Sequence, residues 1–97
     1  MLGTGPLIFR IHTIKRMFQR RISKEDVQEI LETGETIETY PDDRPYPSRL
    51  LLGWRHARPL HVVAAENAKS GETIVVTAYE PSREEWKHDF KKKRTDI

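Results

Sequence analysis

Two apolar runs rich in β-branched residues, at residues 60–66 and 72–79, constrain the fold of this 97-residue chain more than any other feature. The five residues between them include Asn, Ser and Gly, which tolerate the backbone angles of a turn. Pro59 and Pro81 stand at the outer ends, and neither has the N–H group that a strand ladder needs. The pattern predicts an antiparallel hairpin.

Alternation along this hairpin predicts a sheet with two unlike faces. Side chains at every second position of a strand share a face, so one face of each strand is apolar and belongs to a core. The other face is mixed and carries His61, Thr77 and Tyr79. In the second strand, the same alternation assigns three residues to the apolar face: Ile74, Val76 and Ala78.

The N-terminal third predicts two helices. Residues 12–21 have helical spacing, with Ile11, Ile14 and Phe18 on an apolar stripe and basic residues facing away. Ser23 then caps a second helix, and Asp26 completes a capping box. The buried stripe of that helix consists of Val27, Ile30 and Leu31. A left-handed Gly34 is expected to end it.

The remaining segments predict further strands and a last helix. Residues 35–40 and 48–54 are β-prone, and residues 41–47, with three prolines, form a loop. Residues 6–11 form either a short strand or a lead-in. Ser82 caps a C-terminal helix, along which Trp86 and Phe90 dock one face. We therefore expect an α+β fold, with two N-terminal helices, a four-stranded antiparallel sheet and a C-terminal helix.

Length and composition predict one domain, residues 1–97, in which residues 1–9 and 95–97 are loosely ordered. The chain has no cysteine, so it offers neither disulfides nor a thiolate metal site. The four histidines lack metal-ligand spacing, and we predict no metal and no cofactor. Neither a membrane span nor a signal peptide is recognisable, which favours a cytoplasmic location.

Charges occur in blocks along the chain. Residues 10–24 carry six basic residues and no acid, residues 25–43 carry eight acids and no base, and residues 44–61 carry four arginines and no acid. Once folded, such segregation gives a basic face and an acidic face. A basic face suits a partner that bears phosphate groups, such as RNA.

The chemistry that fits these residues is RNA cleavage without metal. Attack of a 2′-hydroxyl on the neighbouring phosphate needs proton transfer and cations that stabilise the extra negative charge. The candidates for proton transfer are His12, His61 and Tyr79. The candidates for holding phosphate are Arg16, Arg20, Arg55, Arg58 and Arg83.

The sequence resembles a prokaryotic family known as domain of unknown function four-two-five-eight. The resemblance rests on a His-x-x-x-Arg-x-x-x-Arg run from His12, on Gly34-Glu35-x-Ile37-Glu38-x-Tyr40, on residues 58–63 and on residues 74–81 with Trp86. The family is similar to RelE, HigB and MqsR ribonuclease toxins. The resemblance implies a compact, RelE-like α+β fold of the microbial-ribonuclease type, metal-free RNA cleavage and a toxin paired with a small antitoxin. It extends to five site residues: His12, Arg16, Arg58, His61 and Tyr79.

Three hypotheses follow. The first is a metal-independent endoribonuclease toxin of a type II toxin–antitoxin pair, which cleaves mRNA, either free or bound to the ribosome. The second is a non-catalytic module of the same fold that binds RNA or protein through its basic face. The third is a housekeeping domain whose acidic segment, residues 25–38, binds a basic partner.

Overall fold

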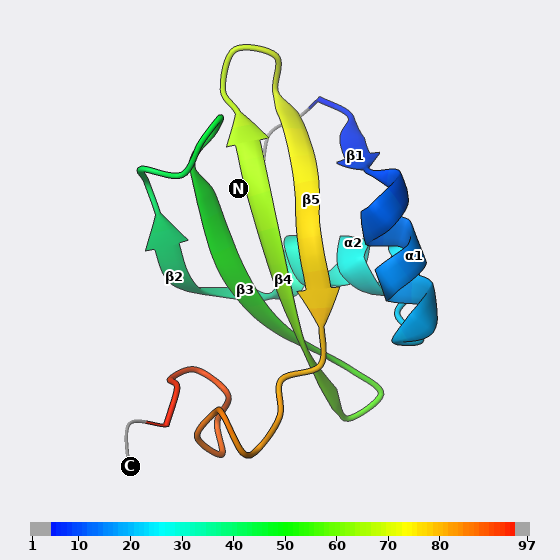
Figure 1. Ribbon diagram of the computed structural model, residues 1–97, viewed down its shortest axis with the longest axis vertical. Coiled ribbons are helices and arrows are strands. Elements are labelled where there is room, and N and C mark those ends of the chain that lie inside the picture. Colours follow the sequence, from blue (N-terminus) through cyan, green and yellow to red (C-terminus); the bar gives the residue numbers. More distant parts are fainter. Residues whose placement is uncertain (1–4, 95–97) are drawn as a thin grey trace.

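The computed structural model describes residues 5–94, which form a single sheet with one helix across one of its faces and a second helix along its edge (Figure 1). The elements in chain order are β1 (Leu7–Phe9), α1 (Ile11–Gln19), α2 (Lys24–Thr33), β2 (Glu35–Tyr40), β3 (Ser48–Arg55), β4 (Arg58–Asn67) and β5 (Glu72–Tyr79). The strands lie in the order β1-β5-β4-β3-β2. We call the side crossed by α2 the helix face, and the side that carries His61 the open face.

The sheet has five strands and is mixed, so the expectation of four antiparallel strands is wrong. The four strands β2 to β5 are antiparallel neighbours, as expected, and the predicted hairpin is β4–β5. The fifth strand is β1, which pairs in parallel with the first half of β5. Residues 6–11 were ambiguous because a three-residue strand has no room to display alternation.

The helix face holds the main core. Its buried residues come from both helices and from β3, β4 and β5, and they include Val27, Ile30, Leu60, Val62 and Val75, each fully buried. The predicted capping box of α2 is confirmed: the backbone N–H of Asp26 donates to the Ser23 hydroxyl, and that of Ser23 donates to the Asp26 carboxylate.

Close contact between α2 and the sheet explains two glycines. A Cβ on Gly53 of β3 would lie 2.5 Å from the Ile30 side chain, and one on Gly34 would lie 2.5 Å from the Ile30 carbonyl oxygen. Gly34 has φ −75° and ψ 171°, so the expected left-handed helix end is wrong. This glycine is needed for close approach rather than for a positive φ.

The helix α1 lies along the second half of β5, beyond the point where β1 ends (Figure 1). Its Thr13 hydroxyl donates to the carbonyl oxygen of Val76, and its Arg20 guanidinium donates to that of Ala78. The side chains of α1 that turn toward the protein are Thr13 and Met17. The apolar stripe Ile11, Ile14 and Phe18 is exposed instead, since the helix is oriented by these polar bonds to the strand edge.

The open face is covered in part by the C-terminal arm, residues 82–94, which lies beyond the end of β5 (Figure 1). Within the described residues no helix follows α2, so the predicted C-terminal helix is wrong. One helical turn begins at Ser82, but the arm then reverses, and Trp86 pairs with Lys93 in a β-bridge. Phe90 has φ +61°, and the Asp89 carboxylate accepts from the Lys91 N–H, which favours a turn over a helix.

A β-bulge in β5 corrects the predicted alternation. The partners of Val63 and Ala64 are Thr77 and Val75, so Val76 is an extra residue. Val75 and Ala78 therefore share the helix face, while Val76 is exposed. The assignment of His61, Thr77 and Tyr79 to one face is unaffected, because His61 pairs with Tyr79 and Val63 with Thr77.

Candidate functional site

A chain of three polar groups crosses the open face at the end of the β4–β5 hairpin. Cross-strand pairing places His61 beside Tyr79, with Nδ1 of the imidazole 3.2 Å from the phenol oxygen. The other ring nitrogen, Nε2, lies 2.8 Å from the backbone carbonyl oxygen of Phe90 in the C-terminal arm. Sheet and arm are thus joined through one imidazole.

The partners fix which atoms donate. A carbonyl oxygen can only accept, so Nε2 carries the hydrogen and donates to Phe90. In the neutral ring Nδ1 then has a free lone pair, which accepts the hydroxyl hydrogen of Tyr79. Burial lowers the pKa of His61, although the bond to Phe90 opposes this, and the neutral form is favoured. The phenol oxygen keeps its own lone pairs for a further partner.

Aromatic rings close over the imidazole. The Trp86 ring lies 4.4 Å from that of His61, centroid to centroid and edge to face, and His61 is fully buried. Tyr79 remains partly exposed on the same face. Burial raises the pKa of Tyr79, with Tyr40 and Glu85 acting in the same direction and Arg20 in the opposite one. Of the two rings, the phenol is the one that a substrate can reach.

Two basic residues of α1 and the arginine at its C-cap flank this face along β5. His12, Arg16 and Arg20 follow one another at intervals of four and therefore share a stripe of the helix. At one end, Arg20 lies 3.4 Å from the Thr77 hydroxyl; at the other, His12 lines a cavity with Ile74 and Val76. Arg16 is exposed between them. We call this stripe the basic ridge.

The opposite side of the open face is also basic. A groove of about 440 Å³ lies between the arm and strands β2 and β3, lined by Glu38, Tyr40, Leu50, Trp86, Lys91, Lys92 and Lys93. Lys91 is paired with Glu35 of β2, and the Lys93 ammonium lies over the Trp86 ring. Basic residues thus border the open face on both sides.

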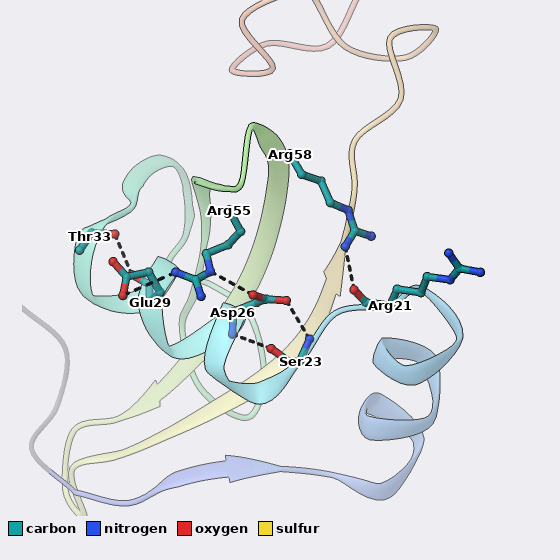
Figure 2. A network of polar contacts seen from close by, with 7 residues as sticks. All are labelled: Arg21, Ser23, Asp26, Glu29, Thr33, Arg55 and Arg58. Carbon is teal, nitrogen blue, oxygen red and sulfur yellow. Dashed lines mark hydrogen bonds and ion pairs between the residues drawn. The ribbon is translucent and has the colours of Figure 1, made fainter.

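The other predicted phosphate ligands are engaged elsewhere (Figure 2). Arg55 pairs with Asp26 and, at 3.9 Å, with Glu29 of α2. Burial raises the pKa of Asp26, but its bonds with Ser23 and Arg55 outweigh that effect and leave the pKa lowered. Arg58 pairs with Glu80 and donates to the backbone carbonyl of Arg21. These contacts hold α2 and the chain between the helices against the sheet.

Arg83, the last of the predicted phosphate ligands, lies over the Phe90 ring of the arm. The candidates for proton transfer are also separated. Since His12 and Arg20 are eight residues apart, about 12 Å of helix lies between the imidazole of His12 and the end of α1 near Tyr79. No sequence pattern predicts that the Phe90 carbonyl joins the site, because a backbone acceptor leaves no signature in residue type.

The residues that the structure describes offer neither a cluster of metal ligands nor a membrane-spanning helix. They contain no group of three or more His, Cys, Asp or Glu residues that could hold a metal ion. They contain no helix that is both long and apolar enough to cross a bilayer.

Comparison with known proteins places the chain at the level of a family. No curated protein and no solved structure gives a significant match. A family model described as "Domain of unknown function (DUF4258)" matches residues 9–80, the segment from the end of β1 to just after β5. This match covers most of the chain, and the protein belongs to that family.

Proposed function

We propose that this protein is a metal-independent endoribonuclease that binds RNA across the open face and cleaves it beside Tyr79. The observation that carries the proposal is the pair of contacts made by His61: Nδ1 lies 3.2 Å from the Tyr79 oxygen, and Nε2 lies 2.8 Å from the Phe90 carbonyl oxygen. With Nε2 donating to that carbonyl, the Tyr79 hydroxyl donates to Nδ1, and the phenol oxygen keeps free lone pairs on an accessible surface, backed by a buried proton acceptor. A reactive oxygen, a base behind it and a group that orients the base form the general pattern of an activated side chain.

The proposed step moves one proton along this chain. The Tyr79 oxygen takes the proton of the ribose 2′-hydroxyl while its own hydrogen passes to Nδ1 of His61. The 2′-oxygen attacks the adjacent phosphorus, and the bond from phosphorus to the 5′-oxygen breaks. The 5′-oxygen takes a proton from water, and a 2′,3′-cyclic phosphate remains. His61 then returns its proton through Tyr79 to the hydroxide formed from that water. The Phe90 carbonyl stabilises the imidazolium, since it accepts the Nε2 hydrogen throughout.

The surrounding charges suit this reaction. Arg20 lies beside the end of β5, where it bonds Thr77 and Ala78, and Arg16 is exposed one turn away on the basic ridge. Guanidinium groups at this position would stabilise the additional negative charge of the phosphorane. His61, being fully buried, does not contact RNA, so its predicted part in proton transfer is that of a proton acceptor behind Tyr79.

We further propose that the enzyme is the toxin of a toxin–antitoxin pair, with a small antitoxin as its protein partner and mRNA as its substrate. This part is supported by the similarity of the family, which the quoted segments resemble, to RelE, HigB and MqsR toxins. The match to a family of unknown function is compatible with it. The proposal places the protein in the cytoplasm, where mRNA is translated.

The test is inducible expression of the protein alone and together with the product of the neighbouring gene. Expression of the protein alone should arrest growth and produce RNA fragments that end in 2′,3′-cyclic phosphate. In vitro, the purified protein should produce the same fragments when a chelator removes metal ions. Tyr79→Phe should reduce the cleavage rate at least 100-fold, in keeping with loss of a general base. Thr33→Val, which removes an exposed hydroxyl from the end of α2, away from the open face, is the control and should retain activity.

A non-catalytic RNA-binding module is the second candidate, and the burial of His61 favours it. On that hypothesis the chain from Tyr79 to Phe90 only anchors the arm. Tyr79→Phe would then leave RNA binding and any cellular effect intact, whereas Arg16→Glu would abolish them. Intact RNA and normal growth on expression of the solitary protein would decide for this alternative.

A further inference from the structure

A second site on the open face is formed where α1 begins. A cavity of about 170 Å³ lies between the start of α1, the loop from β2 to β3, and the surface of β4 and β5. Its lining residues that bear polar or charged side chains are Arg10, His12, Thr13, Asp43, Arg44, Tyr46 and Ser48. The floor is apolar, with Ala65 and Ile74 paired across the two strands.

The charge balance of this cavity is positive. Within residues 5–94, the guanidinium groups of Arg10 and Arg44 have no hydrogen-bond or ion-pair partner. The single carboxylate of the cavity, that of Asp43, accepts the hydroxyl hydrogen of Ser48 and is thereby drawn toward β3. Two arginines whose binding groups are unused, in one concave site, are suited to a dianion or a shared phosphate oxygen.

The size of the cavity restricts the ligand. Sites for whole small molecules begin at roughly 300 Å³, so this cavity fits a single group of a few atoms better than a complete nucleotide. A phosphate group meets both the size and the charge requirement. The apolar floor would lie against the carbon atoms of the attached sugar.

The position of the cavity connects it with the proposed reaction. It opens beside Ile74 and Val76 of β5, the strand that carries Tyr79, and His12 of the basic ridge is part of its wall. A strand of RNA that passes Tyr79 and follows the basic ridge arrives at this cavity. We infer that the cavity binds a phosphate group of the RNA strand outside the cleaved bond, and fixes the register of the strand; this inference rests on the proposed function for RNA as the source of the phosphate.

Two measurements test the inference without using cleavage. The first is an NMR titration of the wild-type protein with inorganic phosphate, in which the amide signals of Thr13, Ser48 and Val76 should shift. The second is the salt dependence of binding to a 2′-O-methyl oligonucleotide, which cannot be cleaved. Each phosphate neutralised contributes about 0.7 to the slope of log K against log salt for single strands.

Arg10→Gln with Arg44→Gln should abolish the phosphate-induced shifts and lower the slope by about 0.7, which is one phosphate contact. Lys15→Gln with Lys69→Gln, which removes the same charge from exposed positions outside the cavity, is the control and should change neither measurement. A lowered slope in the double arginine variant also supports the inference if free phosphate causes no shifts in the wild type. In that case the cavity binds phosphate only when the rest of the RNA strand adds to the binding affinity.

Shifts without a change in slope would overturn RNA as the source and leave a site for free phosphate. If phosphate moves none of these signals and the slope is unchanged, the cavity binds no phosphate. These results are independent of the proposed catalysis. If Tyr79 has no catalytic role, the phosphate titration is still expected to show binding in the cavity. If the cavity binds no phosphate, cleavage beside Tyr79 is still expected to give fragments ending in 2′,3′-cyclic phosphate.

Discussion

The two faces of the sheet are closed by different means. The helix face packs against α2, with α1 along its edge, and holds an almost entirely aliphatic core, in which five side chains are fully buried. The open face is covered only in part, by an arm without regular structure. Trp86 and Phe90, one hydrogen bond to His61 and the ion pair of Lys91 with Glu35 hold this arm. The helix face thus supplies stability, whereas the open face keeps polar groups within reach of solvent.

The strongest test of this difference is Ile30→Ala on the helix face. Ile30 is fully buried against Gly53, so the loss of transfer free energy and the cavity left behind should reduce the free energy of unfolding by about 2–5 kcal/mol. Urea denaturation gives this value. The exposed Gln28→Ala on the same helix is the control, and a similar loss there would refute the assignment of the core.

Trp86→Ala probes the open face in the same way. Its burial is worth about 1.5–3 kcal/mol, but the arm can detach without unfolding the helix face, so the loss should stay near 2 kcal/mol or below. In hydrogen exchange, the amides of Lys87 and Arg94 should lose protection while those of β4 keep theirs. Equal loss of protection in β4 would show that the two faces unfold as one unit.

The buried imidazole makes the open face sensitive to acid. Because the pKa of His61 is lowered from 6.5 in the folded protein, the unfolded chain binds more protons between that lowered pKa and 6.5. Stability should therefore be complete above pH 6.5 and fall below it, by at most about 1.4 kcal/mol per pH unit.

Unfolding of wild type and His61→Gln between pH 5 and pH 8 measures this effect. The glutamine variant keeps a donor and an acceptor but does not titrate in this range, so its curve should be flatter. The exposed His88→Gln is the matched control and should follow the wild type. Parallel curves for wild type and His61→Gln would mean that the imidazole titrates alike in both states.

The smallest effect is expected at the cap of α2. Ser23→Ala removes one half of the capping box and should cost about 1 kcal/mol, measurable by denaturation. Ser23→Asp keeps an acceptor at that position and should recover most of the loss. The cap lies on the helix side of the sheet, so protection of the arm amides should be unchanged in both variants.

The sequence predicted those parts of the fold that local chemistry determines. The capping box, the buried stripe of α2 and the β4–β5 hairpin each depend on residues close together in the chain, and all three are confirmed. The side-by-side placement of His61 and Tyr79 followed from the same hairpin.

The errors arose where distant contacts decide. The arm has helix-forming residues, but contacts of Trp86 and Phe90 with the sheet outweigh that local preference. The Ile11–Phe18 stripe has helical periodicity, yet Thr13 and Arg20 bind the edge of β5 and leave it exposed. Composition also does not reveal which arginines are already engaged in ion pairs. Arg55 and Arg58 pair with residues far away in the sequence.

The bonds that Thr13 and Arg20 make to the edge of β5 also have a consequence for self-association. An unpaired strand edge is a template on which another chain can add, and it is a common origin of fibrils. Here β1 offers three residues, and the carbonyls of Val76 and Ala78 beyond it are already bonded by α1. At the other border, β2 presents exposed Glu35 and Glu38 around a bulge. Both borders are thereby protected against the growth of a continuous intermolecular sheet. The partly uncovered open face therefore does not depend on added strands from other molecules being blocked by a partner, even at high protein concentrations.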